Sequence, residues 1–243
     1  ALVFAAVLAR AAGAQLVWWT PGTLWVRSLA GSISLVCTFY ALTRLPPHVV
    51  LTITNTFPIW VAVLSWPLLH ERPRPAVWLA AGSGVLGIVL IQRPFEGPPA
   101  PEAVALLVAV AASFSTAVAM LGLHHLRGID TRAIVVHFSA TASLVCVAAL
   151  LVGGPVAGLN AWPGPRPLLM LLAVGATATA SQLSLTRAFA AGPPTRVSVI
   201  GLTQVVFAMA LEVWLEDRSY SPGTLVGVAL VVAPTAWVMS LRA

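Results

Sequence analysis

The chain has 243 residues, of which 59% are hydrophobic and only 8% are charged, and its formal net charge is +6. A soluble domain carries about 25% charged residues, so this composition excludes an ordinary water-soluble globule and predicts an integral membrane protein. Every basic residue is an arginine, and the arginines are scattered singly or in pairs among the predicted loops. This scattering argues against a nucleic-acid partner.

Apolar segments follow one another along the chain, separated by breaks rich in proline, glycine and charge. Their lengths suit helices that cross a hydrocarbon core of about 30 Å, whereas the strands of a membrane barrel alternate and run about 10 residues. The sequence therefore predicts an all-α, polytopic helical bundle with about nine transmembrane segments. These are residues 1–9 (incomplete), 23–42, 48–69, 76–92, 103–123, 132–152, 167–188, 196–215 and 222–241.

The distribution of arginine predicts the orientation of the bundle. If the segments alternate, nine arginines fall on one side and four on the other. The arginine-rich side is then cytoplasmic, and so is the C-terminus. The lysine-free composition, rich in alanine and arginine, favours a bacterial inner (plasma) membrane. We interpret the apolar start of the chain as a truncated membrane helix, because no charged region precedes it.

Two stretches of the chain resemble each other over about 45 positions. Each contains Leu-Thr-Arg, a Pro-Pro pair, an apolar span and then a glutamate, Glu71 in the first and Glu216 in the second. The arginine count places these glutamates on opposite sides, so the copies are predicted to be inverted. We predict a first repeat over 1–98 and a second over 99–243. Inverted repeats are typical of secondary transporters, although duplicated bundles also serve as scaffolds.

The first copy also resembles a known family. Tyr40-Ala41-Leu42 closes one helix, Pro58 lies inside the next, Glu71 lies at its end, and glycines follow. This pattern resembles an EamA-type repeat of the drug/metabolite transporter superfamily. The resemblance implies ten helices in two inverted five-helix repeats, with the first helix and part of the second missing here. It also implies a metabolite or drug exporter, sometimes an importer.

Polar side chains inside membrane spans are the first candidates for a transport pathway. Thr52, Asn55, Thr56 and Ile59 share one helix face by their spacing. Pro58 should loosen the helix there, because it removes a backbone hydrogen bond. The alternative is that the threonines bond to their own helix while Asn55 joins two helices.

The second copy has Thr203 and Gln204 near the place where the first has Pro58, so the two clusters are predicted to face each other across a central cavity. Gln182 adds a polar group one helix earlier, and Tyr40 and Trp60 are suited to stack on a planar substrate. The candidate substrate-binding residues are therefore Tyr40, Thr52, Asn55, Thr56, Pro58, Trp60, Gln182, Thr203 and Gln204.

Charged and titratable groups within the spans are few. Glu212 and His137 are candidates for carrying a coupling proton, although an interfacial Glu212 and a structural His137 are the alternatives. Arg27 has two interpretations, as a binding group for an anionic substrate and as an anchor at the cytoplasmic end of its helix.

No sequence pattern indicates a metal site, a cofactor or catalysis. Gly82, Gly84 and Gly87 fit GxGxxG but lie inside an apolar span without a preceding strand, so close helix packing explains them better. We therefore predict a secondary transporter, not an enzyme, that exports a small metabolite or drug-like molecule by alternating access. A membrane-embedded scaffold and an intramembrane enzyme are the alternatives. The expected partners are the substrate and the lipid bilayer, and a homodimer is left open.

Overall fold

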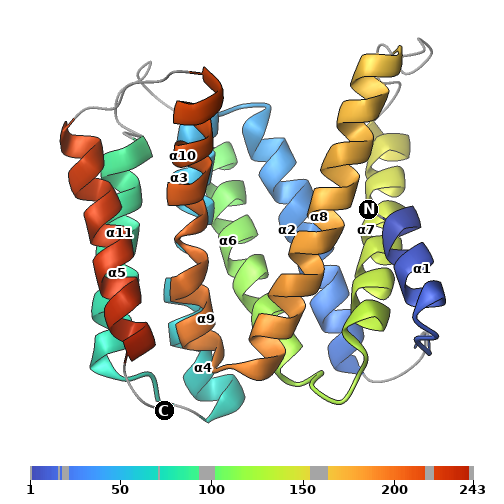
Figure 1. The fold of residues 1–243 in the computed structure, drawn as a ribbon, viewed down its shortest axis with the longest axis horizontal. Coiled ribbons are helices and arrows are strands. Elements are labelled where there is room, and N and C mark those ends of the chain that lie inside the picture. Colours follow the sequence, from blue (N-terminus) through green and yellow to red (C-terminus); the bar gives the residue numbers. More distant parts are fainter. Residues whose placement is uncertain are drawn as a thin grey trace. The chain divides into compact units, whose positions relative to one another are not determined.

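The computed structural model describes residues 2–15, 17, 22–70, 72–92, 102–153, 164–216 and 222–240, and in these ranges all the helices and strands assigned are α-helices (Figure 1). This confirms the predicted fold class of an all-α membrane bundle. The helices are α1 (Leu2–Ala11), α2 (Gly22–Leu42), α3 (Pro47–Thr54), α4 (Phe57–Leu69), α5 (Pro75–Gln92), α6 (Ala103–His124), α7 (Thr131–Gly153), α8 (Pro165–Ala191), α9 (Pro194–Gly201), α10 (Gln204–Glu216) and α11 (Pro222–Ser240).

Seven stretches of the described chain are long and apolar enough to cross a membrane. Two of them combine a pair of shorter helices, α3 with α4 and α9 with α10. The shorter apolar helices α1 and α5 accompany them. Each apolar segment predicted from the sequence therefore corresponds to one helix or to one such pair.

The helices form two compact units, each built from two separate stretches of the chain. Unit 1 consists of residues 1–36 and 118–191, and unit 2 of residues 37–117 and 192–243. In unit 1, α1 packs against α7 and α8. Small residues on α1, Ala5 and Ala9, are buried against Val135 and Val136 of α7. The first part of α2 and the end of α6 complete this unit.

Unit 2 is centred on the contact between α5 and α11. These helices run in opposite directions (Figure 1). Gly87 and Gly227 lie face to face, so closely that a Cβ atom on either would be 2.6 Å from the carbonyl oxygen of the other. Small residues permit such close helix packing in membranes. The packing interpretation of Gly87 is thus supported, whereas Gly82 has no neighbour within 4 Å of its Cβ position.

Two membrane-spanning helices of unit 2 are broken in the same way. α3 and α9 each have 8 residues, α4 and α10 each have 13, and the gap between the members of each pair is two residues. At both breaks the backbone switches to tighter bonds, from the Thr56 amide to Ile53 O and from the Thr203 amide to Ile200 O, each 3.0 Å long. Such i→i+3 bonds are those of a 3₁₀ turn.

The first break lies where Pro58 predicted it, but the second has Val205 at the matching place. Proline is therefore not needed for the break. The feature common to both is a threonine whose hydroxyl donates to the carbonyl three residues back, from Thr56 to Ile53 at 2.6 Å and from Thr203 to Ile200 at 2.7 Å. Side-chain bonds of this kind compete with the helical backbone ladder.

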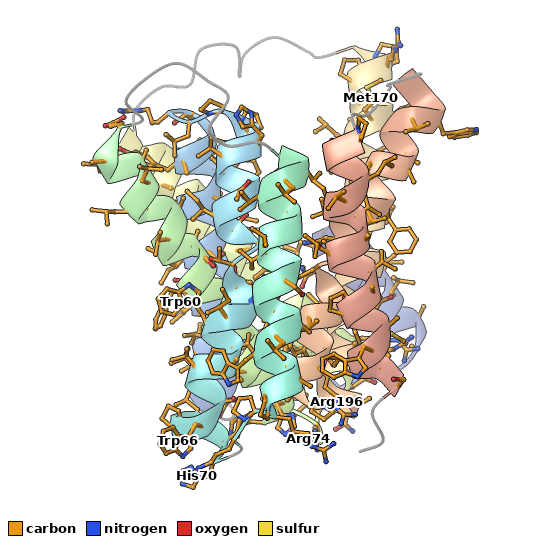
Figure 2. The ribbon with its side chains drawn as sticks, turned by 90° about the vertical axis from the view of Figure 1, so that its left-hand side faces the viewer. Trp60, Trp66, His70, Arg74, Met170 and Arg196 are labelled. Atoms are coloured by element: carbon orange, nitrogen blue, oxygen red, sulfur yellow. The ribbon has the colours of Figure 1, made fainter. Side chains whose placement is uncertain are left out.

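One end of unit 2 carries aromatic and basic residues, and Trp66, His70, Arg74 and Arg196 all lie at this end (Figure 2). α4 ends there, and His70 has the left-handed conformation that closes its last turn, its amide bonded to Trp66 O at 2.9 Å. Tryptophan and arginine are typical of a membrane–water interface. The assignment of this end to the cytoplasm stays a prediction.

Candidate functional site

The two broken helices meet at their breaks. They run in opposite directions, with α4 packed against α9 (Figure 1). Gln204 Nε2, at the first position of α10, donates a 3.0 Å hydrogen bond to Asn55 Oδ1, in the gap between α3 and α4. Thr56 and Ser113 of α6 share a second bond of 2.9 Å between their hydroxyls. We call these four residues, Asn55, Thr56, Ser113 and Gln204, the crossing cluster.

Most donors of the crossing cluster and its neighbours are also bonded within their own helix. Asn55 Nδ2 donates to Leu51 O at 2.7 Å, and Thr52 Oγ1 donates to His48 O at 2.8 Å. This pattern is the one expected from the alternative interpretation of the sequence, in which the threonines bond to their own helix and Asn55 joins two helices. The cluster is neutral and its Asn55 side chain is 95% removed from solvent, at 5% exposure.

The two aromatic candidates form contacts with other side chains. The Trp60 ring packs edge-on against Phe114 of α6, with ring centroids 5.5 Å apart, and Figure 2 places it at the margin of its unit. Tyr40 lies at the end of α2 under the guanidinium of Arg44, which is 5.3 Å from the ring centroid. Tyr40 therefore contacts Arg44, whereas Trp60 lies one turn beyond Thr56 and packs on the neighbour of Ser113.

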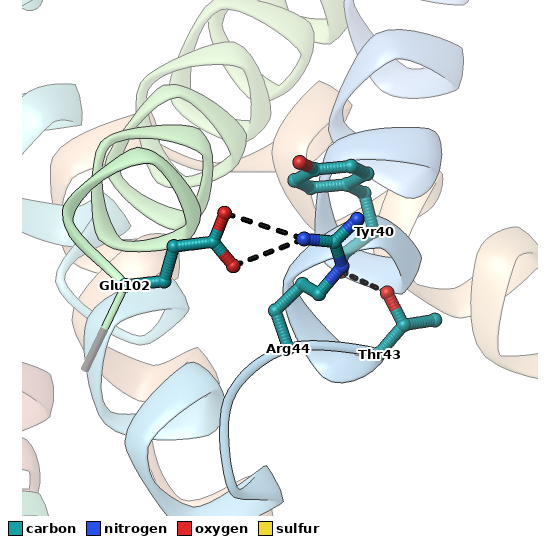
Figure 3. Close-up of polar contacts among 4 residues, drawn as sticks. All are labelled: Tyr40, Thr43, Arg44 and Glu102. Atoms are coloured by element: carbon teal, nitrogen blue, oxygen red, sulfur yellow. Dashed lines mark hydrogen bonds and ion pairs between the residues drawn. The ribbon is translucent and has the colours of Figure 1, made fainter.

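Arg44 forms an exposed ion pair with Glu102 at the start of α6 (Figure 3). Its Nη1 lies 3.2 and 3.1 Å from the two carboxylate oxygens. The hydrogen bond from Arg44 to Glu102, together with the attraction between their charges, raises the pKa of Arg44. This contact lies outside the membrane spans and ties the end of α2 to the start of α6.

A second polar group lies inside unit 1, and we call it the arginine cluster: Arg27 and Ser28 of α2, His137 and Phe138 of α7, and Gln182 of α8. Arg27 Nη2 donates to Gln182 Oε1 at 3.0 Å, and the guanidinium lies 4.1 Å from the centroid of the Phe138 ring. Ser28 Oγ and His137 Nδ1 are hydrogen bonded at 2.8 Å. Two of the predicted residues, His137 and Gln182, thus belong to this cluster.

Arg27 is enclosed by glycine as well as by these side chains. A Cβ atom on Gly31 would lie 2.8 Å from Arg27 Nη1, and one on Gly122 would lie 3.1 Å from Arg27 Cβ. The arginine is only 1% exposed. An interfacial anchor keeps its charged group in water, so burial disfavours the anchor interpretation of Arg27.

Sequence reasoning missed several of these residues. Ser113 belongs to the polar run Ser-Phe-Ser-Thr in an apolar helix, and Gly31 and Gly122 flank Arg27 only in the folded chain. The sequence does contain one indication for Ser113, because a polar residue inside an apolar span is a candidate for a functional contact. Three glutamates named in the sequence analysis lie wholly or by their side chains outside the described part of the structure: Glu71 as a whole, and the side chains of Glu212 and Glu216.

Comparison with known proteins places the chain among transporters. The model of the EamA-like transporter family matches residues 1–93 and 102–240. The pseudopaline exporter of Pseudomonas aeruginosa is 34% identical over 206 residues, covering 83% of this chain and 69% of that protein. An uncharacterised transporter of Helicobacter pylori is 23% identical over 209 residues, covering 85% of this chain and 69% of that protein.

The fold has a counterpart among solved structures. One crystal structure superposes with a TM-score of 0.84 at 22% sequence identity, covering 99% of this chain and 85% of the other. At this identity the likeness shows a shared fold.

Proposed function

Because the chain belongs to the EamA-like transporter family, we propose that it is an exporter of a small metabolite or drug-like molecule that works by alternating access. The relative from Pseudomonas aeruginosa is named as an exporter, which supports the direction. The predicted repeats at 1–98 and 99–243 are part of this proposal, and so is a bacterial inner membrane with a cytoplasmic C-terminus.

The observation that carries the proposal is the matched pair of broken helices. Interrupted helices of opposite direction are the usual place where secondary transporters bind their substrates, because the interruption frees backbone groups near the middle of the membrane. The equal lengths of the two pairs and their opposite directions support the inverted arrangement. A scaffold has no need of two interruptions that are hydrogen bonded to each other.

In this proposal the crossing cluster supplies hydrogen bonds to the substrate. Asn55 and Gln204 present amide groups that donate and accept, and their mutual bond is a neutral contact that a polar substrate group can replace. Pro58 and Thr203 then act through the backbone at the two breaks, and Thr52 supports the first half of its span by its bond to His48 O. The family's known members are transporters, and on that ground we propose no enzymatic activity.

The test is a transport assay with the complete protein in sealed membrane vesicles, in which a metabolite extract is screened for compounds that cross only when the protein is present. Asn55→Leu and Gln204→Leu are then compared with the wild type. We expect each to reduce the flux at least about tenfold, the range in which loss of a buried hydrogen-bonding group is felt. The double variant should be little worse than either single one, because the two groups act together.

Thr54→Val is the matched control, because the Thr54 hydroxyl donates only to Leu51 O of its own helix. It should transport like the wild type. Normal flux in folded Asn55→Leu protein would remove the crossing cluster from the proposal. Absence of any protein-dependent flux would favour the scaffold.

A further inference from the structure

Arg27 is the largest side chain among the fully buried residues of the described chain. It belongs to the second turn of α2, about 8 Å along the helix from Gly22 at 1.5 Å per residue. A charged group in this position is costly to keep, because hydrocarbon and packed side chains solvate it poorly. In membrane proteins such a group is a functional site by default, and its counter-charge has to be identified.

Unit 1 holds no carboxylate that could supply the counter-charge. Its sequence contains a single acidic residue, Asp130. Asp130 is exposed at the start of α7, where it accepts a 2.7 Å bond from the Arg132 amide and pairs with the Arg132 side chain at 3.8 Å. The positive charge of Arg27 is therefore not balanced within its own unit.

The hydrogen-bonding capacity of Arg27 is also not filled. A guanidinium has five N–H donors, and the side-chain partner of Arg27 is the neutral Gln182 oxygen. Its Nε–H is buried without a hydrogen-bond partner among the residues that the structure describes. The ring of Phe138 covers one face of the guanidinium at 4.1 Å. The N–H donors point outward in the guanidinium plane, so a hydrogen-bond acceptor has to approach along its edge. A carboxylate matches that edge, because its two oxygens accept two parallel N–H bonds.

We propose that Arg27 binds a carboxylate of the transported solute, and that the Gln182 amide oxygen occupies this position in its absence. The proposal rests on the transport function proposed above and names its substrate class, a small metabolite with a free carboxylate. Gln182 is partly exposed, so its side chain can turn aside when the solute arrives. A monoanionic carboxylate balances the single charge of Arg27, whereas a phosphate dianion would leave an excess.

Binding is measured on the complete protein in detergent, by thermal shift and titration. The probes are L-amino acids and lactate, each compared with the corresponding amide, so that the carboxylate and its negative charge are removed together. We expect at least one acid to bind about tenfold or more tightly than its amide, because charge-assisted bonds to guanidinium are the stronger ones. Arg27→Gln should abolish this preference. Arg127→Gln removes an exposed arginine of the same unit and should keep it.

Gln182→Glu gives a second test with the opposite expected effect on stability. It replaces the side-chain amide by a carboxylate, so Arg27 has a permanent negative partner. The variant should melt at a higher temperature than the wild type and lose the preference for acids. Gln15→Glu, the same change at an exposed residue, should do neither. A gain in melting temperature keeps the loss of binding from being attributed to misfolding.

The proposal is overturned if no acid binds better than its amide to the wild type, or if folded Arg27→Gln keeps the preference. It is also overturned if Gln182→Glu binds acids like the wild type. The vesicle assay separates this failure from that of the proposed function. Flux of a solute without acid preference would leave transport standing and remove the role of Arg27, whereas acid preference without any flux would count against transport alone.

Discussion

The crossing cluster and the arginine cluster both place polar side chains inside membrane spans, but they differ in charge and in how completely their hydrogen bonds are formed. In the crossing cluster, amides and hydroxyls are neutral, and Asn55 has both its donor and its acceptor side bonded, to Leu51 O and to Gln204. In the arginine cluster a full charge is buried against one amide, one aromatic ring and two glycines. The side chain of Asn55 is hydrogen bonded at both of its polar atoms, whereas Nε–H of Arg27 has no hydrogen-bond partner within the described ranges of the chain.

The difference separates two tasks. A closed neutral network costs little and holds two interrupted helices in register, and bonds of this kind between membrane helices contribute on average about 0.6 kcal/mol. An arginine at the centre of a span costs about 2.5–3.5 kcal/mol on insertion scales, and the cost is lower in the second turn, where Arg27 lies. A cation–π contact returns about 0.5–2 kcal/mol of it. We infer that the crossing cluster holds the two breaks together and offers neutral hydrogen bonds, whereas the arginine cluster keeps a charge available for the substrate.

The strongest way to break this comparison is to place the same negative charge in each cluster. Asn55→Asp replaces the Nδ2 donor that faces Leu51 O by an oxygen, so a buried carboxylate meets a carbonyl. We expect a loss of about 2.5–3.5 kcal/mol in the free energy of unfolding. Gln182→Glu faces a guanidinium instead and should gain about 1.5–3 kcal/mol from a charge-assisted bond. Unfolding of the complete protein in detergent, followed by heat or denaturant, measures both.

Opposite signs for these two variants would support the comparison. A loss of stability in both would show that Arg27 is already neutralised by a group of the complete protein.

A smaller effect is expected from adding a methyl group beside each cluster. The Cβ of Gly31→Ala would lie 2.8 Å from both Arg27 Nη1 and Phe138 Cε2. Overpacking of this kind costs about 1–3 kcal/mol. The matched change Gly201→Ala, beside the break between α9 and α10, meets only Phe57 Cζ at an ordinary 3.5 Å. Its stability should be unchanged or raised by up to about 1 kcal/mol, since alanine is the better helix former.

Equal losses at the two glycines would mean that the packing around Arg27 is no tighter than that around the break. The rise in melting temperature caused by a bound acid is a second measurement on Gly31→Ala and Gly201→Ala. In Gly31→Ala the acid-dependent thermal shift should shrink, whereas in Gly201→Ala it should remain.

The sequence predicts the helices well because membrane spans are long and uniformly apolar. It also predicts that the segments of Asn55 and Gln204 face each other, because the two copies keep the same order of Leu-Thr-Arg, Pro-Pro and span. In the structure the two side chains are joined by a direct hydrogen bond, whereas the prediction placed a cavity between them. The break at Thr203 was harder to predict, since it depends on a hydroxyl bond to Ile200 O and has no proline. The partners of Arg27 come from α7 and α8, more than 100 positions away, and only the packing of the helices reveals them.

The aromatic candidates illustrate the same limit. Composition favoured Tyr40 and Trp60 as stacking groups, yet a residue's depth in a helix does not say toward which neighbour it points. Tyr40 faces the guanidinium of Arg44, and Trp60 faces Phe114.

The smallest effect should come from the exposed ion pair, which gives a baseline for the charges inside. Arg44 and Glu102 lie 3.1 Å apart with about half of each side chain in solvent, at 48% and 44% exposure. Water and salt screen such pairs, so their contribution to stability is slight. We expect Arg44→Gln, Glu102→Gln and the double variant to melt close to the wild type at 0.15 M salt, with any coupling between them vanishing at 1 M. The raised pKa of Arg44 keeps it charged at every working pH, so the melting temperatures of these variants relative to the wild type should not change between pH 6 and pH 8.

Arg27→Gln in the same experiment should shift the melting temperature by an amount that salt does not alter, because burial shields the charge of Arg27 from ions. If the two arginines respond to salt alike, the guanidinium of Arg27 is reached by solvent in the working protein, and the contrast between a screened charge and a reserved one fails.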